Sequence, residues 1–193
     1  MQILGLMGSS RRDGNTNDLL DAALRGASEA GAQVEKVLLP DYKLHHIYNC
    51  KDCKQRGACE EDDFPILRDK ISAADGLIWA SPLYWFTVSG LTKVLLDRLC
   101  CIMYLDTYEA FIEKMKGRLA ATLCVMEETD FNKARHLLGT MEMVYEYCQW
   151  SNLGYVVGLG GSRGTILKHT DTLRQAYELG EKMAKINQTR RKP

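Results

Sequence analysis

A polar loop of ten residues near the N-terminus separates an apolar run from the start of a helical pattern. It reads GSSRRDGNTN over residues 8–17 and follows the apolar run at 3–7. The free N–H groups and the positive dipole end of a helix start favour an anion, and Arg11 or Arg12 adds a charge. The pattern therefore predicts a site for a compact monophosphate, the alternative being a polar loop with an ordinary cap at Asn15 or Thr16. The side-chain donors of the loop are Ser9, Ser10, Asn15, Thr16 and Asn17.

The loop at 8–17 does not carry the motifs of other phosphate chemistries. Only Gly8 and Gly14 are present in the loop, so it is not GxGxxG, which disfavours a dinucleotide site. The loop also lacks the GKS/T end of a Walker loop, which disfavours an NTPase. The loop contains no cysteine, so it is not the C-x5-R loop of a phosphatase, which disfavours hydrolysis of phosphate esters.

A second candidate loop, SPLYWFTVSG over residues 81–90, follows another apolar run. Because ligands of open α/β sheets bind at the carboxyl ends of strands, we expect this loop to lie beside the phosphate loop. Three consecutive aromatic residues are costly to leave in water unless they pack or bind something. A flat conjugated ring next to a phosphate would suit FMN. Alternatively, at least one of Tyr84, Trp85 and Phe86 anchors the following helix in the core.

Cys50, Cys53 and Cys59 form a C-x2-C-x5-C pattern inside a long irregular stretch, residues 40–63. Thiolates two residues apart can bind one metal ion or cluster iron together, and His45 or His46 could complete a zinc site. Three interpretations stay open: no metal, an iron–sulfur cluster, or zinc. The other four cysteines, which we expect to be small buried apolar residues, are Cys100, Cys101, Cys124 and Cys148.

Two further loops should end at the same edge of the sheet. Residues 127–130, EETD, either place acidic groups near the ligand, where they would lower a flavin potential, or cap the next helix, which we favour. Residues 158–164 contain four glycines, which suggests close approach of backbone or mobility. Arg163 in that loop could meet a nicotinamide phosphate, although a solvated arginine is the simpler interpretation.

The elements that must position these loops follow from hydrophobic periodicity. Short apolar runs alternate with helical patterns, which predicts a βαβ series with a parallel sheet. Runs predicted as fully buried strands are 3–7, 76–80, 119–126 and 155–159, and the partly alternating run 34–39 resembles an edge strand. Predicted helices cover 19–27, 64–74, 88–101, 130–148 and 170–186, and the apolar spacing within 130–148 suggests a seam for core packing or for a subunit contact.

Composition limits the class of protein further. With 193 residues, 25 basic and 25 acidic side chains, the formal net charge is zero, which argues against nucleic acid or anionic membrane as a partner. No apolar run approaches the ~20 residues of a membrane span, and the first residues do not form a signal peptide. Seven cysteines without a secretory signal are interpreted as reduced thiols or ligands. We therefore expect a cytoplasmic protein.

The two loops, together with Lys93 and the run Leu96-Asp97-Arg98, resemble the NADPH-dependent FMN reductase-like branch of the flavodoxin superfamily, in particular its iron–sulfur flavoprotein-like members. The resemblance covers residues 1 to about 100 well. It implies a flavodoxin-like three-layer α/β sandwich with a five-stranded parallel sheet in the order 2-1-3-4-5. We expect one FMN-binding domain over 1–188, with the loop insertion 40–63 and a basic tail at 189–193.

The resemblance also implies non-covalently bound FMN and a homodimer or homotetramer. The helices 88–101 and 130–148 are the candidate subunit contacts, with core packing as the alternative. Iron–sulfur flavoproteins carry a fourth cysteine where this chain has Ile47. Phosphate ligands implied by the resemblance are Ser9, Arg11, Asn15, Thr16 and Asn17. Residues implied to line the isoalloxazine are Pro82, Leu83, Tyr84 and Trp85.

The leading hypothesis is an FMN-dependent NAD(P)H oxidoreductase that passes electrons to free flavin, a quinone or another small acceptor. Since the flavin supplies the chemistry, no catalytic acid or base is assigned, and Tyr84 is the side chain expected to orient the ring. The alternative is an iron–sulfur flavoprotein that transfers electrons to protein partners. A third hypothesis is a flavin sensor without enzymatic activity, or a degenerate fold.

Overall fold

A five-stranded parallel sheet forms the centre of the molecule. The computed structural model of the chain describes residues 1–47, 62–104 and 108–190. The strand order is β2-β1-β3-β4-β5, and every neighbouring pair is parallel, as predicted. The strands are β1 (Gln2–Met7), β2 (Gln33–Leu38), β3 (Gly76–Pro82), β4 (Leu119–Met126) and β5 (Ser151–Leu159).

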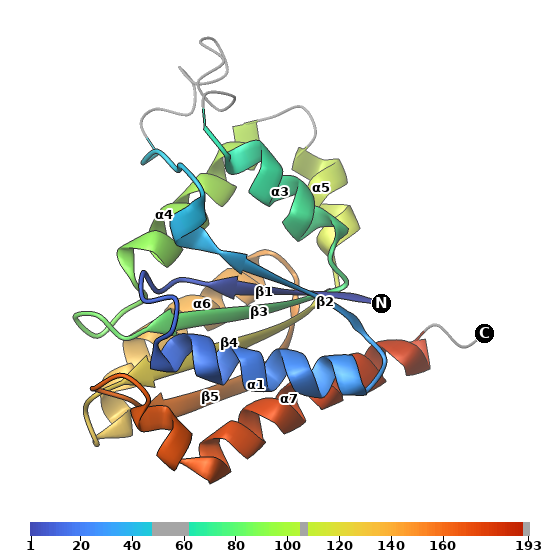
Figure 1. The fold of residues 1–193 in the computed structure, drawn as a ribbon. Coiled ribbons are helices and arrows are strands. Elements are labelled where there is room, and N and C mark those ends of the chain that lie inside the picture. The colour runs from blue at the N-terminus through green and yellow to red at the C-terminus, as the bar shows by residue number, and fades with distance from the viewer. Residues whose placement is uncertain (48–61, 105–107, 191–193) are drawn as a thin grey trace.

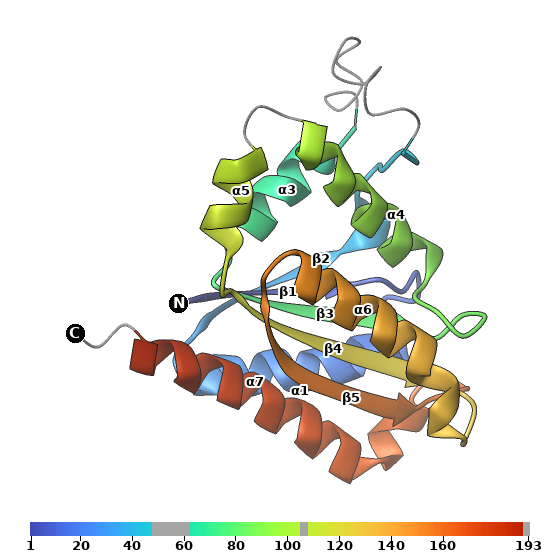
Figure 2. The same cartoon turned by 180° about the vertical axis from the view of Figure 1, so that it is seen from behind.

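Helices cover both faces of the sheet and make a three-layer sandwich (Figures 1 and 2). One face carries α1 (Asn15–Glu29) and α7 (Thr170–Arg190), and the other carries α3 (Phe64–Ala73), α4 (Gly90–Leu99), α5 (Tyr108–Met115) and α6 (Arg135–Tyr147). Alternation along β1 sends Leu4 and Leu6 into the core beneath α3 and α4, and Ile3 and Met7 into the core beneath α1.

The central strands are apolar throughout because both of their faces are covered. Every residue of β3 and of β4 is buried. The expectation that 155–159 is fully buried is wrong: Tyr155 is 60% exposed. β5 is an edge strand that pairs only with β4, so part of its surface faces solvent.

Helix α1 shows the predicted face, with Leu19, Leu20 and Ala23 all buried. It packs so closely on α7 that a side chain at Gly26 would overlap the Tyr177 carbonyl, and one at Gly180 would overlap that of Ala23. The two helices therefore approach each other through their backbones.

Several helix bounds differ from the prediction. α4 begins at Gly90 and not at Val88, because the Ser89 hydroxyl accepts from the Thr92 N–H and caps the helix. A 3-10 turn, Cys100–Tyr104, follows it. The sequence did not predict α5, which has only eight residues and therefore little periodic signal. α7 continues to Arg190, so two residues of the expected tail are helical.

The predicted helix 130–148 is a 3-10 turn, Phe131–Ala134, followed by α6. Of the expected seam, Met141 and Tyr145 are buried in the core of this chain, while Phe131 is 51% exposed. Part of the seam therefore packs inside this chain, and a subunit contact through its exposed part stays a prediction.

No cysteine of the described part forms a disulfide. Cys101, Cys124 and Cys148 are buried as expected, whereas the expectation for Cys100 is wrong, because this residue is on the exposed side of the turn after α4. Burial raises the pKa of the Cys124 thiol to about 12, and burial with the nearby Cys100 raises that of Cys148 to about 11. Both thiols stay protonated near neutral pH. No helix of the described residues is long and apolar enough to span a bilayer.

Candidate active site

The loops after β1 and β3 are joined through the backbone of Gly8. Its N–H donates to the Ala80 carbonyl at 2.8 Å, and its own carbonyl accepts from the Ser89 hydroxyl at 2.5 Å. A side chain at this position would overlap Thr92 Oγ1, which hydrogen-bonds Ser89 Oγ at 3.0 Å. The phosphate loop therefore lies against the start of α4, beside the aromatic loop, as the sequence predicts.

The start of α1 does not carry the ordinary cap at Asn15 or Thr16 that was the alternative to a phosphate site. Gly14 is the N-cap, with no side-chain cap, so neither Asn15 nor Thr16 caps the helix. Asn15 instead bonds the loop after β5: its Nδ2 donates to Ser162 O at 2.8 Å, and its Oδ1 accepts from Ile166 N at 3.2 Å. With no capping side chain, the first N–H groups of α1 remain available to a ligand.

The two loop arginines have different surroundings. Arg12 forms an exposed ion pair with Asp41. Arg11 lines the cavity at the start of α1, and its N–H donates to the Ser9 hydroxyl at 3.2 Å. The geometry therefore favours Arg11 as the cation of the anion site.

Two adjoining cavities lie at this edge of the sheet. The narrow cavity, of about 230 Å³, is lined by Ser9, Arg11, Gly14, Asn15, Thr16, Pro82, Leu83, Tyr84, Val125, Met126, Glu127, Gly160 and Gly161. The wide cavity, of about 520 Å³, is lined by Leu83, Trp85, Phe86, Met126, Glu127, Glu128 and Thr129. They share Leu83, Met126 and Glu127, so together they form a continuous site.

Most of the predicted residues come together there, with two differences. Trp85 lines the wide cavity only. Asn17 lines neither, because its side chain donates to Asp21 and accepts from Lys36, each at 2.9 Å. The sequence placed the loops after β4 and β5 at this edge, and Glu127, Gly160 and Gly161 do line the narrow cavity. It did not single out Val125 and Met126 at the end of β4, which the rule that ligands bind at the carboxyl ends of strands could have found.

The aromatic loop contains a strained two-residue turn. Tyr84 and Thr87 exchange backbone hydrogen bonds of 3.0 and 3.1 Å. Between them, Trp85 has φ +48° and Phe86 φ +65°. Turns with positive φ at both central positions normally use Asn-Gly, and such conformations cost bulky residues of the order of 1–3 kcal/mol each. Trp85 is 92% exposed, so core packing does not explain its place in this turn.

The acidic loop after β4 has divided roles. The Asp130 carboxylate caps the following turn by accepting from Asn132 N at 3.1 Å, as favoured from the sequence. Glu128 pairs with Lys133 at 2.7 Å. Glu127 lines both cavities, which is the other interpretation of this loop. Arg163 forms an exposed ion pair with Asp13 at 2.8 Å and lines neither cavity.

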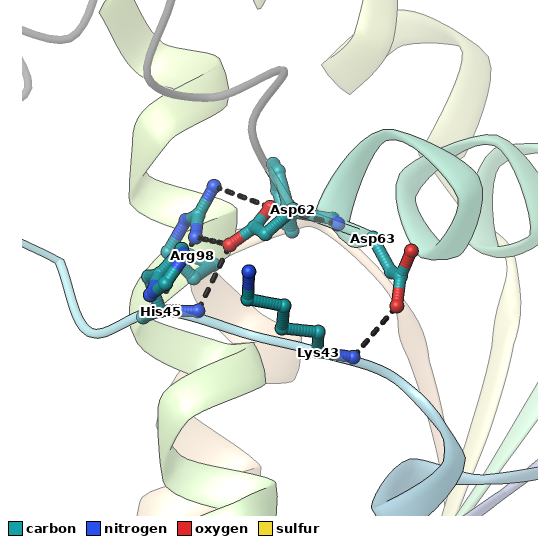
Figure 3. Close-up of polar contacts among 6 residues, drawn as sticks. Lys43, His45, Asp62, Asp63 and Arg98 are labelled. Atoms are coloured by element: carbon teal, nitrogen blue, oxygen red, sulfur yellow. Dashed lines mark hydrogen bonds and ion pairs between the residues drawn. The ribbon is translucent and has the colours of Figure 1, made fainter.

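A buried ion pair connects the far end of α4 to the chain on either side of the cysteine pattern (Figure 3). Arg98 and Asp62 form this pair, and their side chains are 3% and 0% exposed. Asp62 also accepts from the N–H groups of His45, at 2.9 Å, and Phe64, at 3.0 Å. Burial alone would raise the pKa of the Asp62 carboxyl, but these hydrogen bonds and Arg98 together lower it below its usual value.

A second contact supports the same junction: Asp63 accepts from the Lys43 N–H at 2.6 Å (Figure 3). Residues 43–45 and 62–64 therefore lie side by side. Cys50, Cys53 and Cys59, the predicted metal ligands, lie outside the described residues. Within the described ranges, no group of three His, Cys, Asp or Glu side chains is arranged to hold a metal ion.

The strand order, and a cavity between the loops of β1 and β3, define a flavodoxin-like α/β protein. Solved structures agree on the fold. RosB, crystallised with a bound intermediate, has a TM-score of 0.77 at 20% identity, over 98% of this chain and 81% of that chain. The Trp repressor binding protein of Bacillus subtilis has a TM-score of 0.70 at 24% identity, over 92% and 96%.

Sequence comparison gives the family. A model of NADPH-dependent FMN reductases matches residues 1–189. An iron-sulfur flavoprotein of Archaeoglobus fulgidus is 30% identical over 185 residues, which cover 95% of this chain and 79% of that protein. YwqN of Bacillus subtilis, whose name describes an NAD(P)H-dependent FMN-containing oxidoreductase, is 27% identical over 93% of this chain and 96% of its own. The chain therefore belongs to the NADPH-dependent FMN reductase family and is an FMN-dependent oxidoreductase.

The residues present fit FMN. The narrow cavity combines Arg11, the Ser9 hydroxyl and the uncapped start of α1, which together suit a phosphate dianion. The wide cavity continues past Leu83 between an aromatic wall and the end of β4, which suits a flat ring.

Replacing Gly8 by alanine is expected to lower the free energy of unfolding by about 1–3 kcal/mol, because the new methyl group would overlap Thr92 Oγ1 in a packed core. Thr92→Ala removes that oxygen, so the double variant should lose less than the sum of the two single losses. Urea unfolding of the four proteins measures this. Additive losses in the free energy of unfolding would contradict the steric overlap between a side chain at residue 8 and Thr92 Oγ1.

Replacing Trp85 by Asn and Phe86 by Gly together is expected to stabilise the protein by about 1–2 kcal/mol, since these residues accept positive φ. The same variant should bind FMN more weakly, because it loses the aromatic wall. Thermal unfolding and flavin titration measure the two effects. The control, Trp85→Ala with Phe86→Ala, keeps the strain and should show only the loss of affinity; an equal gain in stability would contradict this account.

Replacing Asp62 by Asn is expected to cost about 3–5 kcal/mol at pH 7, because Arg98 would remain buried without its counter-ion. The pKa of Asp62 is lowered by folding, so its contribution is complete above the unfolded pKa of about 4 and is lost as pH falls below it. Urea unfolding between pH 7 and 2.5 should therefore show the two proteins converging. Asp97→Asn, which removes an exposed partner of Lys93 on the same helix, should cost under about 1 kcal/mol.

Proposed function

We propose that this FMN-dependent oxidoreductase takes its electrons from NAD(P)H and passes them to a small acceptor: free flavin, a quinone or a related oxidant. The observation that carries the proposal is the continuous pair of cavities, with an anion site at one end and an aromatic and acidic opening at the other. Bound FMN would supply the redox chemistry by accepting a hydride and returning two electrons. The net reaction consumes NAD(P)H, one proton and the oxidised acceptor, and yields NAD(P)⁺ and the acceptor reduced by two electrons and two protons.

The residues of this chain would bind the phosphate of FMN and orient its ring. Arg11 and the first N–H groups of α1 hold the phosphate, and the Ser9 hydroxyl shapes the loop by accepting from the Arg11 N–H. Both backbone groups of Tyr84 that face Thr87 are used within the turn, so its half-exposed side chain is the part left to orient the ring. Met126 and Leu83, shared by the two cavities, form the apolar wall of the passage between them.

Two adjacent arginines provide a matched test of the anion site. Arg11→Gln should weaken FMN binding by about 10- to 100-fold, since a charge-assisted hydrogen bond is worth about 1.5–3 kcal/mol. Arg12→Gln, which removes the exposed partner of Asp41, should change it less than about twofold. Quenching of flavin fluorescence on titration of the apoprotein measures both. Equal effects would overturn the placement of the phosphate.

Anaerobic mixing of the FMN-loaded protein with NADH or NADPH tests the donor. Bleaching of the oxidised flavin bands by either nucleotide, followed by recovery on addition of a quinone, is the expected result. Tyr84→Ala should slow the bleaching if its side chain orients the ring. A flavin that binds normally but is reduced by neither nucleotide would overturn this function in favour of electron transfer between proteins.

A second candidate function is that of an iron–sulfur flavoprotein, favoured by the relative in Archaeoglobus fulgidus. Ile47, at the position expected for a fourth thiolate, packs against the core of this chain. Iron and acid-labile sulfide analysis of anaerobically purified protein distinguishes the candidates: stoichiometric iron and sulfide support the electron-transfer function, and their absence leaves the reductase.

A further inference from the structure

Glu127 places a carboxylate in the wall of both cavities. Its side chain lies against Gly161, where a Cβ atom would come within 2.9 Å of Oε1. Glu128, beside it, lines the wide cavity and is paired with Lys133. No ion pair among the described residues includes Glu127, so its charge is the less compensated of the two.

The opposite wall of the wide cavity is aromatic. Trp85 and Phe86 come from the strained turn and remain 92% and 44% exposed, so they offer flat apolar surface to a ligand. Leu83 and Met126 complete the apolar part. The flavin ring assigned to this cavity and a planar acceptor stacked beside it would share this surface.

The charges around the wide cavity are predominantly negative. Of its seven lining residues, two are carboxylates and none is a cation. Arg11 lines only the narrow cavity, where the phosphate would neutralise it. Arg163 is engaged by Asp13, and Lys133 compensates Glu128. An oxidant that approaches this opening therefore meets aromatic surface together with net negative charge.

We propose that Glu127, supported by Glu128, is the specificity-determining group for the electron acceptor, and that it selects cationic and neutral planar oxidants against anionic ones. This inference rests on the proposed function and names the acceptor class of that same site. A planar quinone would take up two electrons and two protons to become the hydroquinone. The electrons and one proton come from the hydride of NAD(P)H, and the second proton comes from solvent.

The size of the effect follows from Coulomb's law. One carboxylate about 5 Å from a unit charge, at a site open to solvent with a dielectric constant near that of water, changes the rate of encounter and binding by about tenfold between acceptors of opposite sign. Because the site is open to solvent, the discrimination should weaken as the ionic strength rises.

The test uses FMN-loaded protein reduced photochemically, so it does not depend on the nucleotide donor. The reduced protein is mixed anaerobically with three naphthoquinones that carry a trimethylammonium, a hydroxymethyl or a sulfonate group on the ring remote from the quinone. Flavin reoxidation is followed by absorbance at low and high salt. The variants are Glu127→Gln, Glu128→Gln and, as a control, Glu178→Gln, which removes an exposed carboxylate paired with Arg174 on α7.

The expected result is a cationic-to-anionic ratio of rate constants of about ten at low salt, corrected for the potentials of the quinones, and a lower ratio at high salt. Glu127→Gln should reduce the ratio severalfold and Glu128→Gln less, while Glu178→Gln, with the same change in net charge, should leave it unchanged. A ratio near one in the native protein, or equal ratios in all four proteins, would overturn the inference.

Failure of the inference and failure of the proposed function give different results. Protein that binds FMN and is bleached by NAD(P)H, but reoxidises without regard to acceptor charge, overturns the inference alone. Protein that does not retain FMN before any acceptor is added overturns both. Glu127→Gln is unusable as a test if it also weakens flavin binding. In that case the salt dependence of the native protein and the ratio in the Glu128→Gln variant still test whether negative charge selects the acceptor.

Discussion

The contact of the Gly8 backbone with Ala80 and Ser89 is the constraint on which the site depends. It joins the end of β1 to the end of β3 and to the N-cap of α4 with no side chain between them. Any side chain at residue 8 would overlap Thr92 and push the loops apart. Because this backbone contact brings the two loops together, an anion site at α1 and an aromatic surface after β3 form one continuous cavity.

Helix α4 connects the contact at Gly8 to the other helices on its face of the sheet. Its first turn is capped by Ser89 at the phosphate loop, and its last turn carries Arg98, which is buried against Asp62. A buried ion pair contributes little net stability compared with an apolar pair, but it is costly to break. It therefore holds residues 43–45 and 62–64 in one arrangement beside the last turn of α4 (Figure 3).

The strained turn and the carboxylate at the end of β4 indicate how function shaped the site. Trp85 and Phe86 occupy backbone conformations that suit Asn and Gly, and they gain little from burial in the free chain. The strained turn opposes local stability, and its two central residues line the wide cavity together with Glu127.

Apolar runs and polar loop chemistry are local signals, and they were sufficient to predict the parallel sheet and the two principal loops. The strand order came from the resemblance to a known family. Spacing alone could not choose between Arg11 and Arg12, because the choice depends on Asp41, about thirty residues away along the chain. The family resemblance implied Arg11. The sequence could not show that Asn17 turns toward Lys36, that Asn15 holds the loop after β5, or that Glu127 rather than Asp130 faces the cavity. Those outcomes depend on long-range packing, which composition and spacing do not encode locally. The sequence thus determined which chemistry the loops offer, and the tertiary structure decided which side chains are free to perform it.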